Sequence, residues 1–256
     1  MFTEHIQLPN KISYADGQKP NEKVLTIEPC FRGFGTTLGN ALRRVLLSSL
    51  TGTAITEVKI TGADHEFSSL DGVKEDVVDI ILNLKAVRFK LHTDEPVELS
   101  LKVSGAKKVT AKDFDKNTDV EVINPDAPIC SLSSKDASFE MTAVVQKGRG
   151  YESVDQRNEE KKEIGSIAID AIYTPVVNVS MDVSQARVGQ DINFDKVELG
   201  IETDGSITPE EAVEEASKVL VKHFNLFTGD VALEEEVVEE AEEEAAPAEE
   251  TEESDK

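Results

Sequence analysis

The sequence predicts an α+β fold, built from short, mostly antiparallel strands and three amphipathic helices. Four segments alternate apolar and polar residues with a period of two, which is the pattern of half-buried strands. These segments begin at Val97, Phe139, Val177 and Val197. Three further segments repeat apolar residues at helical spacing. Because few helices separate the strands along the chain, antiparallel pairing is favoured over a parallel sheet.

The net charge limits the class of partner. The 256 residues carry 51 acidic and 27 basic side chains, which gives a formal net charge of −24. Residues 234–256 alone hold 13 of the acids and a single lysine. A surface of this sign does not attract nucleic acid through its bulk charge. Contact with DNA is therefore expected only indirectly, through partner proteins, or at a small local patch.

The two ends of the chain and its cysteines carry further signals. Residues 231–256 are acidic and contain no aromatic residue, so they are predicted to be disordered. The N-terminus lacks the basic and apolar stretches of a secretory signal, and no run of about 18 apolar residues exists, so a cytoplasmic protein without membrane contact is expected. Cys30 and Cys130 are far apart in sequence and are expected to be buried, unpaired thiols.

The first predicted helix, residues 36–50, has two different faces. One face is apolar at helical spacing and is expected to pack into the core. Its members are Leu38, Ala41, Leu42, Val45, Leu46, Ser49 and Leu50. The second face consists of Asn40, Arg43, Arg44 and Leu47. Arginine beside an apolar residue on a non-core face is typical of a protein contact. On helix geometry alone, a solvated face with one exposed leucine is the commoner explanation.

The other two predicted helices differ in how much apolar surface they carry. Residues 73–84 have a single apolar stripe, which is typical of ordinary core packing. The last helix has the clearest start signal, with Thr208 as the cap, Pro209 in the first helical position and Glu211 in the third. Its apolar residues reach Phe227 and cover more than one side, which indicates a dimer or a bundle, and Gly229 is expected to end it.

No catalytic motif is evident. The four histidines are scattered, and Asp113–Asp115 fits a surface loop better than a metal site. Phe31–Thr37 is similar to a glycine-rich phosphate loop before a helix, but it lacks the lysine of such loops. A tight strand-to-helix turn explains these glycines as well. Lys147–Tyr151 is a small basic patch, which is more typical of a hairpin turn or a protein-contact loop than of an RNA site.

Taken in order, these segments resemble the α subunit of bacterial RNA polymerase. Phe34–Ser49 resembles the signature helix of that family. Further similar motifs follow in the family's order, and the resemblance covers about residues 5–229. These motifs are His65–Ser68, Gly72–Val73, Glu75–Asp76, Asn83–Lys85, Lys147–Tyr151, Asp170–Ala171, Tyr173–Val176, Arg187–Gln190, Asp195–Lys196 and Gly205–Ala212.

The resemblance implies a discontinuous dimerisation domain with two long helices, formed by residues 1–50 and 176–230. An inserted, mostly antiparallel β domain would occupy residues 51–175 and contact the large polymerase subunits. Residues 231–256 would be an acidic, disordered tail in place of the helical DNA-binding domain that usually follows in the family. Dimerisation is expected to use side chains of both long helices. These are Leu38, Leu42, Val45, Leu46, Val219, Leu220, Phe224 and Phe227.

The resemblance also implies a non-catalytic role. The chain would be a homodimeric scaffold on which the β and β′ subunits of DNA-directed RNA polymerase assemble for transcription, with ω and σ in the complete enzyme. Nucleotide addition in the family belongs to a magnesium site on β′, so no catalytic residue, cofactor or metal is expected here. The positions that resemble β contacts are Arg44, Leu47, His65, Glu66, Phe67 and Ser68. Lys85 resembles a position near β′.

Three other interpretations stay open. One is an archaeal or eukaryotic counterpart of the same scaffold, some of which carry a cysteine-rich cluster that two distant cysteines cannot form. The second is a self-contained enzyme that binds a nucleotide at residues 33–39, against which the missing lysine and the missing acid–base pair argue. The third is a dimeric adaptor unrelated to transcription, which explains the helices but not the ordered motifs.

Overall fold

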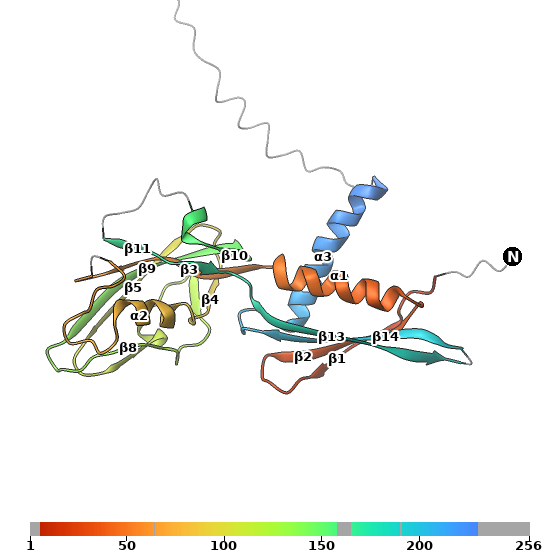
Figure 1. Ribbon diagram of the computed structural model, residues 1–256, viewed down its shortest axis with the longest axis horizontal. Helices are drawn as coiled ribbons and strands as arrows, with labels where there is room; N and C mark the ends of the chain where they lie inside the picture. Colours follow the sequence, from red (N-terminus) through yellow and green to blue (C-terminus); the bar gives the residue numbers. More distant parts are fainter. Residues whose placement is uncertain (1–5, 64, 158–164, 190, 230–256) are drawn as a thin grey trace, which may run out of the picture. The chain divides into compact units, whose positions relative to one another are not determined.

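The computed structural model describes residues 6–63, 65–157, 165–189 and 191–229. The chain divides into two compact units, Met1–Val219 and Leu220–Lys256. The described residues form an α+β fold (Figure 1), so the predicted fold class is confirmed. Its three α-helices are α1 (Phe34–Ser48), α2 (Val77–Leu84) and α3 (Pro209–Thr228).

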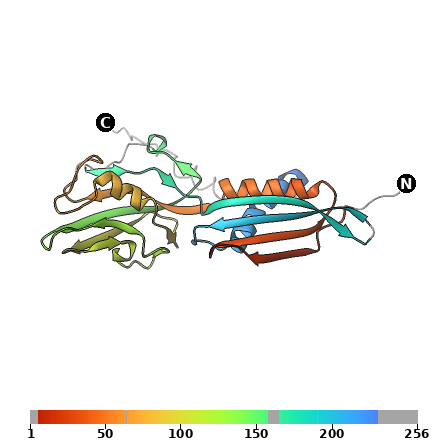
Figure 2. The same ribbon diagram turned by 60° about the horizontal axis from the view of Figure 1, so that its bottom comes forward.

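The first sheet joins strands from distant parts of the sequence. Its order is β1–β2–β14–β13, and every pairing in it is antiparallel. The strands are β1 (Lys11–Asp16), β2 (Glu22–Cys30), β13 (Val176–Val188) and β14 (Asp191–Thr203). Strand β2 lies directly beside β14, with Leu25 opposite Leu199 (Figure 1). Helix α1 packs along one face of this sheet over β13 and β14, as Figure 2 shows.

The second sheet has the order β11–β3–β9–β5 and is also antiparallel. Its strands are β3 (Thr51–Ile60), β5 (Val97–Ser104), β9 (Ser138–Arg149) and β11 (Ser166–Ala168). Three two-stranded pairs accompany it, β4–β7, β6–β8 and β10–β12. Their bounds are β4 (Phe89–Leu91), β7 (Val120–Val122), β6 (Lys108–Thr110), β8 (Pro128–Ser131), β10 (Tyr151–Glu152) and β12 (Ala171–Ile172). Two short 3₁₀ turns complete this part, η1 (Ala111–Asp113) and η2 (Val154–Gln156).

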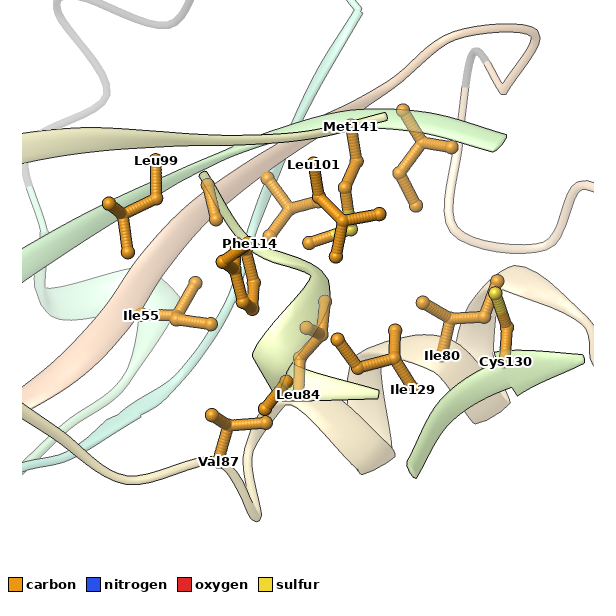
Figure 3. Packing of buried hydrophobic residues seen from close by; sticks show 14 of the residues in the cluster. Ile55, Ile80, Leu84, Val87, Leu99, Leu101, Phe114, Ile129, Cys130 and Met141 are labelled. Carbon is orange, nitrogen blue, oxygen red and sulfur yellow. The ribbon is translucent and has the colours of Figure 1, made fainter. Parts of the chain in front are cut away.

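The core of this second part is apolar and continuous. The alternating faces predicted for β5 and β9 supply Leu101 and Met141, which α2 meets with Ile80 and Leu84 (Figure 3). Phe89 packs edge-to-face on Phe114, with ring centroids 5.8 Å apart. This core holds the surface segments around α2 in fixed places, because closely packed interiors resist displacement.

Helix α1 begins two residues earlier than predicted and ends at Ser48 rather than at Leu50. The early start follows from Gly33, whose positive φ of 81° turns the chain directly into the helix. The early end follows because strand β3 already begins at Thr51. Leu50 is buried as predicted, but it lies in the link between the helix and the strand.

Helix α2 begins at Val77 rather than at Val73. Val73 instead forms a β-bridge with Leu132. The Lys74 amide donates to the Ser131 carbonyl oxygen at 3.0 Å, so this apolar residue belongs to an extended segment beside β8. A second departure concerns Val177, which was predicted on the buried face of its strand. A register shift between Val176 and Asn178 turns Val177 outward, where it is 58 % exposed.

Candidate protein-interaction surfaces

The turn before α1 binds a carboxylate of its own chain. Asp195 of β14 accepts hydrogen bonds from the amides of Gly33 and Gly35, at 2.8 and 3.2 Å. A Cβ on Gly35 would lie 2.7 Å from the Asp195 Cβ, so glycine is needed for this close approach. Because the two amides already hold an anion, the geometry supports a strand-to-helix turn rather than a phosphate loop.

The outer face of α1 presents one arginine without an intramolecular partner. The Arg43 Nε donates to the Val179 carbonyl oxygen at 3.0 Å, which ties that side chain to β13. The Asn40 amide donates to the Thr36 carbonyl oxygen within the helix. The Arg44 carbonyl oxygen accepts the Ser48 hydroxyl at 2.8 Å, but the exposed Arg44 side chain makes no hydrogen bond or ion pair with the described residues. Leu47 is half-buried. Arg44 and Leu47 are therefore the members of this face that are available to another molecule.

The His65–Ser68 segment forms a turn in front of α2. The Ser68 amide donates to the His65 carbonyl oxygen at 3.1 Å, and the Ser68 carbonyl oxygen accepts the Val77 amide at 3.3 Å. Glu66 is exposed, and Phe67 is 78 % exposed at the tip of the turn. An aromatic ring that is held in water by an anchored backbone is a common anchor of protein interfaces.

Lys85 follows directly after α2 and is paired with a carboxylate. Its Nζ donates to Asp170 Oδ2 at 3.2 Å, and Asp170 Oδ1 accepts the Val154 amide at 3.1 Å. The hydrogen bond from Val154 and then the one from Lys85 hold the pKa of the Asp170 carboxyl below its usual range. Lys85 and Asp170 therefore form an ion pair that is partly open to solvent.

The residues predicted for dimerisation differ in their exposure. Leu46 is completely buried inside its own chain and Leu42 is 9 % exposed, so both serve the core of the protomer. They are buried together with Gly35 and Gly39 of the same helix. The apolar pattern of the sequence did not place these two positions on the buried face, because glycine has no side chain. Leu38, Val45, Val219 and Leu220 are half-buried, and Phe224 and Phe227 are exposed. Among the α1 residues predicted for dimerisation, only Leu38 and Val45 leave part of their apolar surface accessible.

The Lys147–Tyr151 segment has a packing role that its sequence did not reveal. It ends β9 and starts β10, and Gly148 lies against the ring of Tyr173. A Cβ on Gly148 would come within 2.5 Å of that ring. The Tyr173 amide donates to the Gly150 carbonyl oxygen at 2.9 Å. Gly148 is thus explained by a close approach inside the protein, and Gly150 by its positive φ of 68°.

The acidic and cysteine residues of the described ranges have structural surroundings. No group of three histidine, cysteine or acidic side chains there is arranged to hold a metal ion. The Asp113 carboxylate accepts the Thr110 amide at 3.0 Å, and Phe114 is buried, so the predicted surface loop is in fact a structured turn. Cys30 and Cys130 are buried free thiols, as predicted.

Comparisons with known proteins find a matching family and a similar chain. Residues 58–174 match the family described as the RNA polymerase Rpb3/RpoA insert domain. The chain is also 49 % identical over 203 residues to the DNA-directed RNA polymerase subunit alpha of Oceanobacillus iheyensis. The chain belongs to the bacterial RNA polymerase α subunit family.

The RNA polymerase α subunit match covers 79 % of this chain and 64 % of the Oceanobacillus relative. The chain thus spans a little under two thirds of that protein's length. The insert-domain match begins inside β3 and ends directly before β13, so it contains α2 and the Lys85–Asp170 ion pair. None of the helices in the described ranges is both long and apolar enough to cross a bilayer.

Proposed function

We propose that this chain is a non-catalytic α subunit of DNA-directed RNA polymerase. It forms a homodimer and is the scaffold on which the β and β′ subunits assemble, with ω and σ in the complete cytoplasmic enzyme and DNA contacted only through the complex. The observation that carries this proposal is the 49 % identity to an RNA polymerase α subunit, because it extends over 203 residues. The exposed residues described above are the proposed sites of dimerisation and of contact with β and β′.

Dimerisation rests on the apolar surface of α3. The last turns of this helix expose Val221, Phe224, Leu226 and Phe227, with exposed fractions from 54 to 88 %. Large apolar side chains gathered on one helix end are costly in water and mark a contact with another protein. The half-buried Leu38 and Val45 of α1 are separate proposed contacts of the dimer. In this proposal, residues 1–50 and 176–230 form the dimerisation domain.

The proposed contacts with β lie on two elements. On α1 they are Arg44 and Leu47, since the Arg44 side chain has no partner among the described residues and Leu47 is half-buried. In front of α2 they are His65, Glu66, Phe67 and Ser68, with the exposed Phe67 ring as the anchor. An arginine and an aromatic ring are the side chains that most often dominate binding energy at an interface.

The proposed contact with β′ is Lys85, in the inserted β domain of residues 51–175. Its ammonium group is held by Asp170 rather than moving freely, so less side-chain entropy is lost when a partner binds. One protomer contacts β and the other contacts β′, which gives the two identical chains different roles. The predicted tail, residues 231–256, lies outside the described residues.

The proposal is tested by co-purifying the tagged full chain with β and β′ and sizing the product. We expect a dimer that captures β, followed by β′. The Arg44→Ala variant should remain dimeric but lose β, because removing one member of a buried charged contact costs about 2–5 kcal/mol, or roughly 30-fold or more in affinity.

The matched control is Lys102→Ala, which removes an exposed ion pair with Glu140 on the second sheet. This variant should capture β as well as the unmodified chain does, because exposed pairs contribute little. Capture of β at full strength by Arg44→Ala would disprove the assigned contact. A chain that is dimeric but captures neither large subunit would disprove the scaffold itself.

A further inference from the structure

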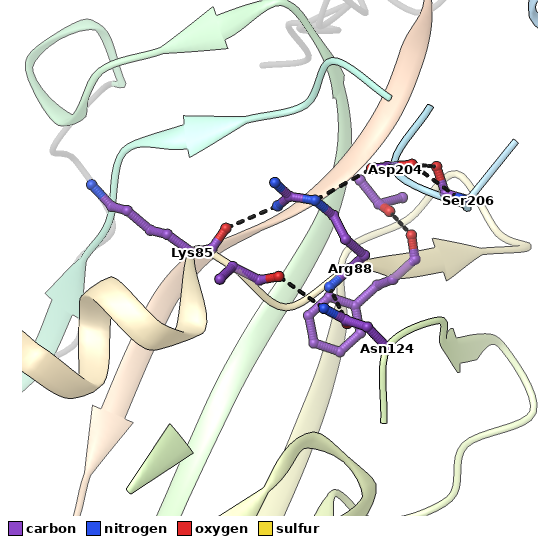
Figure 4. Close-up of polar contacts among 8 residues, drawn as sticks. Lys85, Arg88, Asn124, Asp204 and Ser206 are labelled. Carbon is purple, nitrogen blue, oxygen red and sulfur yellow. Dashed lines mark hydrogen bonds and ion pairs between the residues drawn. The ribbon is translucent and has the colours of Figure 1, made fainter. Parts of the chain in front are cut away.

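Arg88 lies between α2 and β4, three residues after Lys85, and holds the backbone around that lysine. Its Nη1 donates to the Lys85 carbonyl oxygen at 2.9 Å. Its own amide donates to Asn124 Oδ1 at 2.7 Å, and Asn124 Nδ2 donates to the Ala86 carbonyl oxygen at 2.9 Å (Figure 4). The segment that carries Lys85 is therefore fixed by polar contacts on both of its sides.

The same guanidinium group reaches the first sheet. Arg88 Nε forms an ion pair with Asp204 Oδ2 at 3.4 Å. Asp204 follows directly after β14, in the turn that leads into α3. Its other carboxylate oxygen accepts the amide and the hydroxyl of Ser206, at 2.9 and 2.6 Å (Figure 4). One arginine thus joins the Lys85 segment to the start of the long C-terminal helix.

The environment of this pair makes it more than a surface contact. The Asp204 side chain is only 10 % exposed, and that of Arg88 is 31 % exposed. A Cβ on the neighbouring Gly205 would meet Asn21 at 3.0 Å and Ile123 at 3.3 Å, so the turn packs closely against the residue before β2 and the residue after β7. Arginine suits this position because its planar fork serves two acceptors at once, which lysine does not do.

We infer that Arg88 is a positioning residue, which together with Asp204 holds the Lys85 surface at a fixed place relative to the turn before α3. This inference rests on the proposed function in one respect: that the Lys85 segment contacts β′ and that α3 takes part in dimerisation. Its structural content does not depend on that function. The arginine itself need not touch β′, since it acts through the backbone of Lys85.

The test uses the full chain with Arg88→Ala, Asp204→Asn and the double substitution. Asparagine keeps an oxygen for Ser206 and removes the charge. Each single variant should weaken capture of β′ by the preformed complex with β on the order of tenfold, and the double variant should weaken it no further, because contacting residues of one polar network are not additive. Dimer size and capture of β should stay unchanged, since the β contacts lie on other elements.

Hydrogen exchange on the unbound full chain gives an independent reading. Asp204→Asn should speed amide exchange in residues 85–89, and Arg88→Ala should speed it in residues 204–208, while Lys102→Ala changes neither segment. Equal loss of β and β′ capture would mean general destabilisation and would overturn the inference. So would unchanged exchange at the remote segment. If the unmodified chain binds neither β nor β′, the proposed function fails, and the exchange result alone decides the role of Arg88.

Discussion

The most severe steric test of the fold is a single methyl group at Gly52. This residue lies in β3, close against the Tyr173–Pro175 segment that links β12 to β13. A Cβ built on Gly52 would be 1.7 Å from the Tyr173 carbonyl oxygen and 3.2 Å from Pro175. The obstacle is backbone, and Tyr173 is itself only 3 % exposed, so no side-chain rotation relieves the clash.

The expected cost of Gly52→Ala follows from that distance. The carbonyl would have to move by about 1.3 Å to reach even the 3.0 Å limit of real contacts. Forcing an extra methyl group into a close-packed site costs 1–3 kcal/mol and sometimes more, and we expect about 3 kcal/mol here. For a domain of this size, that corresponds to a fall in Tm of roughly 6–12 °C.

The matched control is Gly200→Ala in β14. There the added Cβ would meet only the Ser180 hydroxyl at 2.5 Å, and the next atom is 3.8 Å away. The Ser180 hydroxyl donates to the Gly200 carbonyl oxygen at 3.4 Å in an exposed position. Turning it away about χ1 relieves the clash and loses only this long hydrogen bond, so the substitution should shift Tm by less than about 2 °C. Thermal unfolding of both variants, followed by circular dichroism at one protomer concentration, separates the two cases. A Gly52→Ala protein whose Tm equals that of the Gly200→Ala control would refute the packing argument.

Two further predictions concern capping and burial. Thr208→Ala should lower stability by about 1 kcal/mol in thermal unfolding, because it removes the hydroxyl that accepts the Glu211 amide at 3.3 Å, whereas Thr208→Ser should cost little; equal losses in both variants would argue against the cap. Burial raises the pKa of Cys130 to about 12, so neither Cys130 nor the buried Cys30 should react with a disulfide reagent at pH 8 until the protein unfolds. Above pH 9 the unfolded thiol ionises first, so the stability linked to Cys130 falls as the pH rises towards 12. Cys130→Ala should make the fall in stability shallower without removing it, because burial also raises the pKa of Tyr173 to about 12. Rapid labelling of the native protein would contradict the buried geometry.

Local signals in the sequence correctly predicted those helix ends that depend only on residues close by in the chain. The cap of α3 is an example, since Thr208 and Glu211 stand three residues apart and bond each other as expected. Gly229, with φ of 76°, ends the helix where predicted. The start of α1 could not be predicted in this way. Its cap is supplied by Asp195, more than 150 residues later, and only the folded sheet brings that carboxylate to Gly33.

The sequence predicted which residues share a helix face, but not which of them are bound by distant parts of the same chain. The helical period placed Arg43 and Arg44 on one outer face, but it could not show that Arg43 is bound by β13 and Arg44 is not. Helical spacing placed Leu46 on the core face of its helix, where it is fully buried, whereas the family resemblance also named it as a dimer contact. Asp170, which pairs with Lys85, lies 85 residues away in sequence. No local pattern reports such a partner.

The pairing of β2 with β14 also sets the order of events during synthesis. Leu25 and Leu199 lie opposite each other, although more than 170 residues of chain are made between them. At 5–20 residues per second, β2 waits roughly 10–30 s before its neighbour leaves the ribosome. The strands of the second sheet are complete by residue 168 and can close first. Until then the long edge of β2 is uncovered, so a nascent chain carries the hazard of wrong strand pairing at its first sheet.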